Sequence, residues 1–146
     1  MRVYIPALVS ELEDCVSGTW APTKGYAVTP MMRDVSSSDD DEVLEEQARD
    51  AAGTDSVLEL GSTVRAVVVA DYARADVAAD PGGHPAAVTM TGRLMPDAIA
   101  CIFADERESA PDAAAAANGD AEALGRLDER TMLWFDISEA TAVAQG

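Results

Sequence analysis

Basic residues are scarce in this chain. Of its 146 residues only ten are Lys or Arg, against 27 Asp or Glu, and the formal net charge is −17. Binding to nucleic acid or to an anionic membrane surface requires a basic face that neutralises phosphates. We therefore expect neither nucleic acid nor a membrane surface among the partners of this protein.

Histidine and cysteine are equally scarce. His84 is the single histidine, so a two-histidine metal site cannot form, and it lies in the loop Asp80–Pro85, where we interpret it as a solvated side chain. Cys15 and Cys101 are far apart, lack a C-x-x-C pattern and fall within apolar patterns, which favours buried free thiols. The chain also lacks a Walker loop, a dinucleotide fingerprint and a nucleophile elbow, so standard nucleotide sites are not expected.

Long apolar runs are missing as well. No run approaches the roughly 20 residues that span a bilayer, and Met1–Pro6 lacks the apolar stretch of a signal peptide. We expect a soluble cytoplasmic protein. Leu, Ile, Val and Phe make up 29 of 146 residues, close to the level of roughly 20% at which highly charged chains are disordered. These residues nevertheless cluster into strand-like runs, which predicts a folded chain.

In the first half of the chain, the apolar pattern alternates between strand and helix. It predicts a strand over 2–5, a helix from Pro6 to about Val16, and a strand over 26–29 that ends at Pro30. This order is typical of a right-handed crossover between parallel strands. Asp39 and Glu42 then resemble a capping box before a helix that ends at Gly61.

In the second half, strands dominate. Residues 64–71 contain three consecutive Val and predict a central strand buried on both faces. Strands over 87–91 and 98–103 are expected to form a hairpin, followed by helical segments from Pro111 to about Leu127 and a last strand over 132–135. The order βαβαβββαβ predicts a single α/β domain over 1–146, with a mixed sheet of five to six strands, two to three packed helices and a frayed tail over 137–146.

Four segments together resemble a known family. They are Met1–Pro6, Tyr26–Pro30, Val67–Asp71 and Leu133–Asp136. In this order they resemble an uncharacterised family of small, acidic, single-domain actinobacterial proteins that carries a domain of unknown function, and the resemblance spans most of the chain. It implies one cytoplasmic domain and supplies neither an activity nor catalytic residues.

Three carboxylates follow predicted strands and could carry chemistry. If the strands are parallel neighbours, Asp71, Asp105 and Asp136 converge at one sheet edge and offer hard oxygen ligands to Mg²⁺ or Mn²⁺. Arg33, just after the Pro30 turn, is a candidate bidentate anion clamp. The alternative is that each Asp satisfies turn backbone and that Arg33 forms a surface salt bridge.

These observations leave two classes of function open. The favoured hypothesis is a noncatalytic interaction or regulatory module, without a cofactor, whose acidic surface binds a basic protein partner. The alternative is a small divalent-metal-assisted enzyme that acts on a phosphate-containing substrate. A third interpretation assigns the charge to solubility and salt adaptation alone. An exposed edge strand near the predicted hairpin also leaves homodimerisation open.

Overall fold

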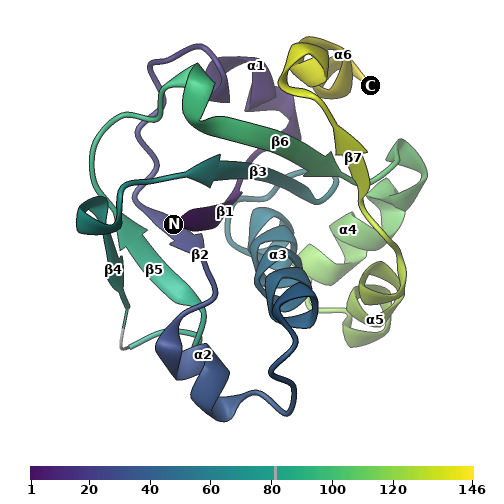
Figure 1. The fold of residues 1–146 in the computed structure, drawn as a ribbon. Helices are drawn as coiled ribbons and strands as arrows, with labels where there is room; N and C mark the ends of the chain where they lie inside the picture. Colours follow the sequence, from purple (N-terminus) through teal and green to yellow (C-terminus); the bar gives the residue numbers. More distant parts are fainter. Residues whose placement is uncertain (81) are drawn as a thin grey trace.

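The computed structural model describes residues 1–80 and 82–146 and contains one seven-stranded sheet (Figure 1). The strands are β1 (Arg2–Pro6), β2 (Lys24–Tyr26), β3 (Ala66–Asp71), β4 (Val77–Ala79), β5 (Ala87–Met90), β6 (Ile99–Ala104) and β7 (Leu133–Phe135). Their spatial order is β4-β5-β2-β1-β3-β6-β7, and every neighbouring pair is antiparallel. The α/β class is confirmed. The strand number exceeds the predicted five to six, and the prediction of a mixed sheet is wrong.

Six α-helices and five 3-10 turns in the described residues accompany the sheet. The helices are α1 (Leu12–Cys15), α2 (Pro30–Val35), α3 (Asp41–Leu58), α4 (Ala110–Ala117), α5 (Ala121–Glu129) and α6 (Ala140–Gln145). The 3-10 turns are η1 (Val9–Glu11), η2 (Arg74–Asp76), η3 (Pro96–Ala98), η4 (Arg107–Ser109) and η5 (Ile137–Glu139). None of the helices described is long and apolar enough to cross a bilayer.

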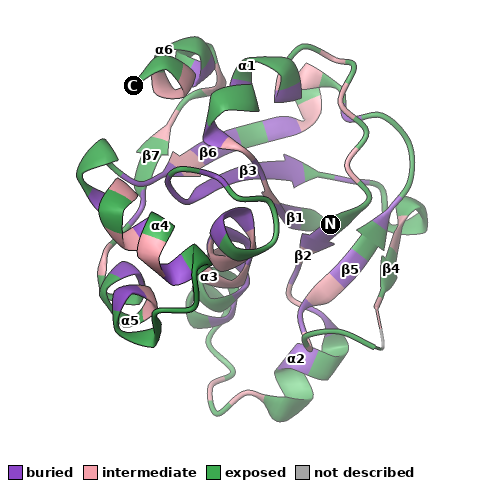
Figure 2. Ribbon diagram, turned by 180° about the vertical axis from the view of Figure 1, so that it is seen from behind, coloured by how far each residue is buried: buried purple, intermediate pink, exposed green. Residues whose placement is uncertain are grey.

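Strand β3 is the buried centre of the molecule, as its run of Val predicts. Its residues Ala66–Ala70 are all buried (Figure 2). Val68 packs on the sheet face that contacts α1 and α6, whereas Val67 and Val69 pack on the opposite face under α3. Because successive side chains of a strand point to opposite faces, β3 joins the two layers of the core.

The predicted crossover between the first two strands is wrong. β2 lies antiparallel beside β1, with Tyr4 opposite Tyr26. A parallel crossover needs a connection that spans the sheet, and the helical segment between these strands is only the short η1 and α1. Gly18 then takes a φ of +95°, which L side chains rarely adopt, after α1 has ended. The chain therefore returns beside β1 in the opposite direction.

The predicted hairpin between β5 and β6 is also wrong. β5 pairs with β2 and β4, whereas β6 pairs with β3 and β7. The connection between them is fixed elsewhere, since Leu94 is buried and its N–H donates to the carbonyl of Trp20. The sheet edges are β4 and β7, so an edge available for homodimerisation lies at one of these strands, and β4 forms a hairpin with β5 rather than β5 with β6.

Helices α2 and α3 both begin at sequence-encoded caps. Pro30 begins α2 as well as ending the extended segment, because the Thr29 hydroxyl accepts the N–H of Met32 as an N-cap. The N-cap of α3 is Asp40, one residue after the start of the predicted box. Gly53 does not interrupt α3, and Gly61, at φ +74°, follows its end as predicted.

Residues 137–146, for which the sequence predicts a frayed tail, form η5 and α6. Ala140 is buried against the core on the α1 side of the sheet, and Val143 packs at its border. The guanidinium of Arg107 donates to the carbonyls of Val143 and Ala144 at 2.7 and 3.1 Å. These contacts fix the end of the chain to the core, where α6 packs beside α1.

Candidate interaction surface

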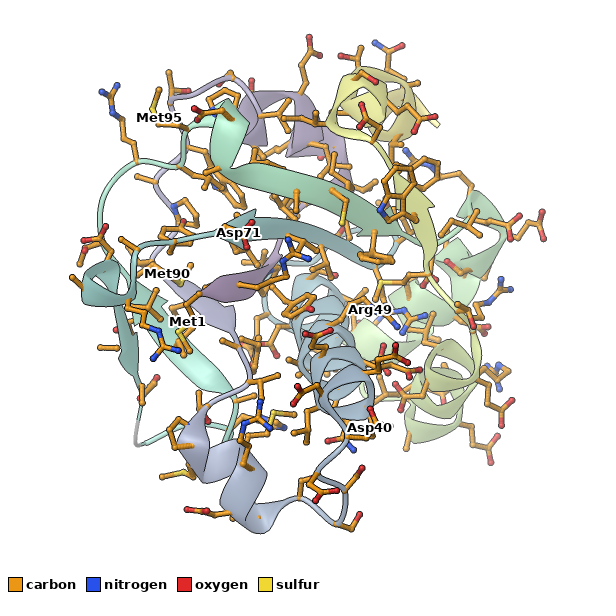
Figure 3. The ribbon with its side chains drawn as sticks, in the orientation of Figure 1. Met1, Asp40, Arg49, Asp71, Met90 and Met95 are labelled. Carbon is orange, nitrogen blue, oxygen red and sulfur yellow. The ribbon has the colours of Figure 1, made fainter. Side chains whose placement is uncertain are left out.

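The three carboxylates proposed as metal ligands do not come together, because β6 runs antiparallel to both β3 and β7 and carries Asp105 to the sheet edge opposite Asp71 and Asp136. Asp71 lies at the end of β3, where its carboxylate accepts two bonds from the Arg2 guanidinium, at 3.1 and 3.2 Å (Figure 3). Asp105 follows β6 and lies beside the opposite end of β3, where its N–H donates to the carbonyl of Arg65. A strand of this length separates the two by roughly 20 Å.

Asp105 takes part in a buried ion pair with Arg65. The Arg65 guanidinium donates to its two carboxylate oxygens at 2.6 and 3.0 Å, and the two side chains are 1% and 2% exposed. Arg65 also donates to the carbonyl of Arg130. A buried charge requires a partner of this kind, so both residues are committed to the fold.

Asp136 is committed to a helix cap. Its carboxylate accepts the backbone N–H and the hydroxyl of Ser138, and these bonds hold the pKa of Asp136 below its usual range. Glu139 completes a capping box by accepting the N–H of Asp136. Across residues 1–80 and 82–146, no group of three His, Cys, Asp or Glu side chains could hold a metal ion.

Arg33, the predicted anion clamp, pairs with Asp41 at the start of α3, with 2.9 Å between nitrogen and oxygen. Both side chains are about half or more exposed, at 48% and 71%. This is the surface salt bridge that the alternative interpretation predicted. The guanidinium of Arg33 is therefore paired with a carboxylate of the protein itself, at the position where the clamp hypothesis expected a bound anion.

Acidic side chains collect on the helices that cover the α3 side of the sheet. α3 carries six acidic residues and one Arg, and α5 carries three acidic residues and one Arg. Of these nine carboxylates, only Asp41 and Glu46 lie within 4 Å of a basic group in the described part of the chain. Figure 1 shows α3, α4 and α5 together on this side. α3 and α5 are far apart in the sequence, and the fold places Asp50 and Asp128 beside one groove.

A groove of about 500 Å³ runs along this surface between α2, α3 and the segment 84–85. We call it the α2–α3 groove. Met32, Val35 and Pro85 give it apolar walls, and Asp50 of α3 and Asp128 of α5 add carboxylates. A groove with this lining can hold the apolar stem and the charged end of a Lys or Arg side chain together.

The surroundings of Asp50 disfavour its ionised form. Burial raises its pKa above the ordinary value, and the neighbouring Glu46 and Asp128 raise it further, against the opposing influence of Arg49 and Arg65. No basic group lies within 4 Å of its carboxylate in the described residues. Asp50 was not predicted from the sequence, and no local signal singles it out, because it is two positions from Ala48 and from Ala52 and so does not share their buried helix face.

A second hollow, of about 680 Å³, lies between β1, β2, β5 and the end of α3. We call it the β1–β2 cavity. One wall is fixed by Tyr26, whose hydroxyl donates to Asp55, and by His84, whose ring meets that of Tyr26 edge-on at 5.6 Å. His84 Nδ1 accepts the N–H of Ala86, so Nε2 carries the proton of the neutral ring. The single histidine therefore borders both hollows.

The fold and its surface define an α/β protein built on one antiparallel sheet, with an acidic helical side. Residues 1–143 match the model of a family of unknown function, DUF6912. The chain belongs to this family, which confirms the resemblance seen in its strand segments. No curated protein and no solved structure matches the chain.

Proposed function

We propose that this chain is a noncatalytic cytoplasmic interaction or regulatory module that binds a basic protein partner through the acidic surface of α3 and α5. The α2–α3 groove is the anchor of that surface, where a Lys or Arg side chain of the partner lies between Asp50 and Asp128. The observation that carries the proposal is the half-buried carboxylate of Asp50, which has Glu46 and Asp128 as well as Arg49 and Arg65 around it but no basic group within 4 Å in the described residues.

Electrostatics support a basic partner. Burial and the carboxylates of Glu46 and Asp128 disfavour the ionised form of Asp50, and a cation that enters the groove offsets this effect. The remaining acidic groups of α3 and α5 lie around the groove and speed the encounter with a basic surface. Binding is consequently expected to weaken as the salt concentration rises.

The proposal is tested with a fluorescent arginine homopeptide and the full chain, by fluorescence anisotropy at low and physiological salt. We expect binding that weakens with salt, and a loss of about tenfold or more in affinity for the double variant Asp50→Asn/Asp128→Asn, because each charge-assisted hydrogen bond contributes about 1.5–3 kcal/mol.

A matched control separates the groove from the net charge. Glu13→Gln/Asp14→Asn removes the same charge from α1, on the opposite side of the sheet, at exposed positions. We expect this variant to bind the peptide nearly as well as the natural chain. Equal losses in both double variants contradict the groove, and an absence of binding at low salt contradicts the proposed function.

A further inference from the structure

The β1–β2 cavity has the size of a small-molecule site and a lining that is partly apolar and partly acidic. Ligand sites are typically concave, about 300–1,000 Å³, and mostly apolar with a few convergent polar groups. This cavity, at about 680 Å³, falls within that range. Ile5, Cys15 and Val88 are buried side chains that line it, and the ring of Trp20 adds a partly buried aromatic surface.

The polar part of the lining is strongly negative. Glu11, Asp55, Glu59 and Asp80 line the cavity, against Lys24 as the one formal cation in its lining. None of the four carboxylates lies within 4 Å of a basic group in residues 1–80 and 82–146. Asp55 instead accepts the hydroxyl of Tyr26, and burial together with this carboxylate raises the pKa of Tyr26.

The walls come from elements that are fixed to one another. Gly25 of β2 packs so closely on β1 that a Cβ there would lie 2.7 Å from the side chain of Val3 and 3.1 Å from the carbonyl of Tyr4. The bond from Tyr26 to Asp55 ties β2 to α3, and the N–H of Ala27 bonds to the carbonyl of Ala86. A cavity bounded in this way is preorganised, so a ligand need not order it.

We propose that the β1–β2 cavity binds a small organic cation, an amine with an apolar ring, whose ring lies against Trp20 and Val88 and whose ammonium group faces Asp55, Glu59 and Asp80. The apolar part removes the ring from water, and the carboxylates supply acceptors for the ammonium protons. Anionic ligands are disfavoured because they meet the same carboxylates. This site is distinct from the α2–α3 groove, although His84 borders both, and it stands without the proposed protein partner.

Three indole compounds of similar shape test the charge requirement on the full chain. Tryptamine carries an ammonium group, tryptophol a hydroxyl and indole-3-propionate a carboxylate. We expect saturable binding of tryptamine in isothermal titration calorimetry, binding of tryptophol weaker by about tenfold or more, and no binding of indole-3-propionate. Amide shifts in ¹⁵N NMR spectra should centre on Gly25, Gly83 and Ala87, which line the cavity.

Variants locate the binding. Glu59→Gln/Asp80→Asn removes two of the facing charges and should weaken tryptamine binding by about tenfold or more, whereas Glu13→Gln/Asp14→Asn removes the same charge outside the cavity and should leave it unchanged. Leu8→Trp places a ring in the cavity and should abolish binding. The NMR map of the natural chain decides the question if this last variant fails to fold.

Several outcomes overturn the inference. They are an absence of saturable tryptamine binding up to its solubility limit, equal affinities for tryptamine and tryptophol, or shifts that centre on the α2–α3 groove. An arginine homopeptide that binds at Asp50 while tryptamine fails would overturn this site alone. The reverse result would overturn the protein-docking function alone, so the two proposals are separable.

Discussion

Arg65 and Asp105 join the start of β3 to the end of β6 through a buried, two-bond ion pair. Arg2 and Asp71 make a similar contact at the other end of β3, but their side chains are 51% and 55% exposed. The two pairs have nearly the same chemistry and differ in their access to water. Water screens the exposed pair and is excluded from the buried one, so their contributions to stability should differ widely.

Asp105→Asn should lower the free energy of unfolding by about 3–5 kcal/mol, because it leaves the Arg65 charge buried without its counter-ion. Asp71→Asn, the matched change at the exposed pair, should lower it by less than about 1 kcal/mol. Urea unfolding of the two variants measures both values. Similar losses would show that the burial of the first pair has no energetic consequence.

Asp50→Asn should raise the melting temperature at neutral pH. Burial raises the pKa of Asp50 in the folded chain by more than the nearby Arg49 and Arg65 lower it, so the fold binds its proton more tightly than the unfolded chain does. Ionisation of this group therefore lowers stability as pH rises from the ordinary pKa of 3.8 toward and through the raised value. The amide removes this loss. Thermal unfolding across pH should show the advantage of the variant shrinking as the pH falls.

A destabilising effect of Asp50→Asn at neutral pH would contradict this account. The expected combination, a more stable fold with weaker peptide binding, is characteristic of a residue retained for binding rather than for stability. If the Asp50 carboxylate had a purely structural role, its conversion to the amide would lower the stability of the protein.

At the scale of elements, α6 shows how a short helix is fixed by its packing. It has six residues, too few to be stable alone, and it depends on the burial of Ala140 and on the bonds from Arg107. Ala142 lies in the same helix and is exposed. This pair of alanines offers a test with matched chemistry.

Ala140→Asp should lower the free energy of unfolding by about 1–3 kcal/mol, because it places a carboxylate in the apolar core without a partner. Ala142→Asp makes the same change in solvent and should have little effect. Chemical denaturation distinguishes the two. Equal and small effects would mean that the end of the chain is frayed.

The sequence could predict elements better than their pairing. The Val run of β3, the acidic start of α3 and the glycine that follows its end are local signals, and they predict these elements to within a few residues, with the N-cap at Asp40 rather than Asp39. Strand direction depends on how far each connection reaches, and the apolar pattern over 6–16 does not reveal that its helix has only four residues. β4 was missed because Val77 is its single branched residue.

The same limit applies to the candidate sites. The hypothesis that Asp71, Asp105 and Asp136 share a metal site required three strands of one direction, and it fails at Asp105 because β6 is antiparallel to β3 and β7. The α2–α3 groove joins Asp50 to Asp128 across 78 positions of sequence. No local pattern encodes such a pair, whereas the excess of acidic residues that makes it plausible is visible in the composition.

At the scale of the whole molecule, the net charge of −17 should dominate the response to ions. Screening of repulsion raises stability with any salt, whereas a specific ligand at ~100 times its dissociation constant adds about 2.7 kcal/mol. Because the described residues hold no cluster fit for a metal, NaCl should raise the melting temperature as much as Mg²⁺ or Mn²⁺ at equal ionic strength. A selective rise with either divalent ion would contradict this expectation and restore the metal-assisted alternative.

We propose that the acidic side of the molecule recognises a basic partner at one place, the α2–α3 groove. The most direct measurement is a chemical-shift map of the ¹⁵N-labelled full chain with the arginine homopeptide at physiological salt. We predict shifts centred on Gln47, Asp50, Thr54 and Asp128, which line the α2–α3 groove, with α1 and α6 unaffected. Shifts spread over acidic residues on both sides of the sheet would mean that the charge attracts cations without a binding site, and would contradict the claim.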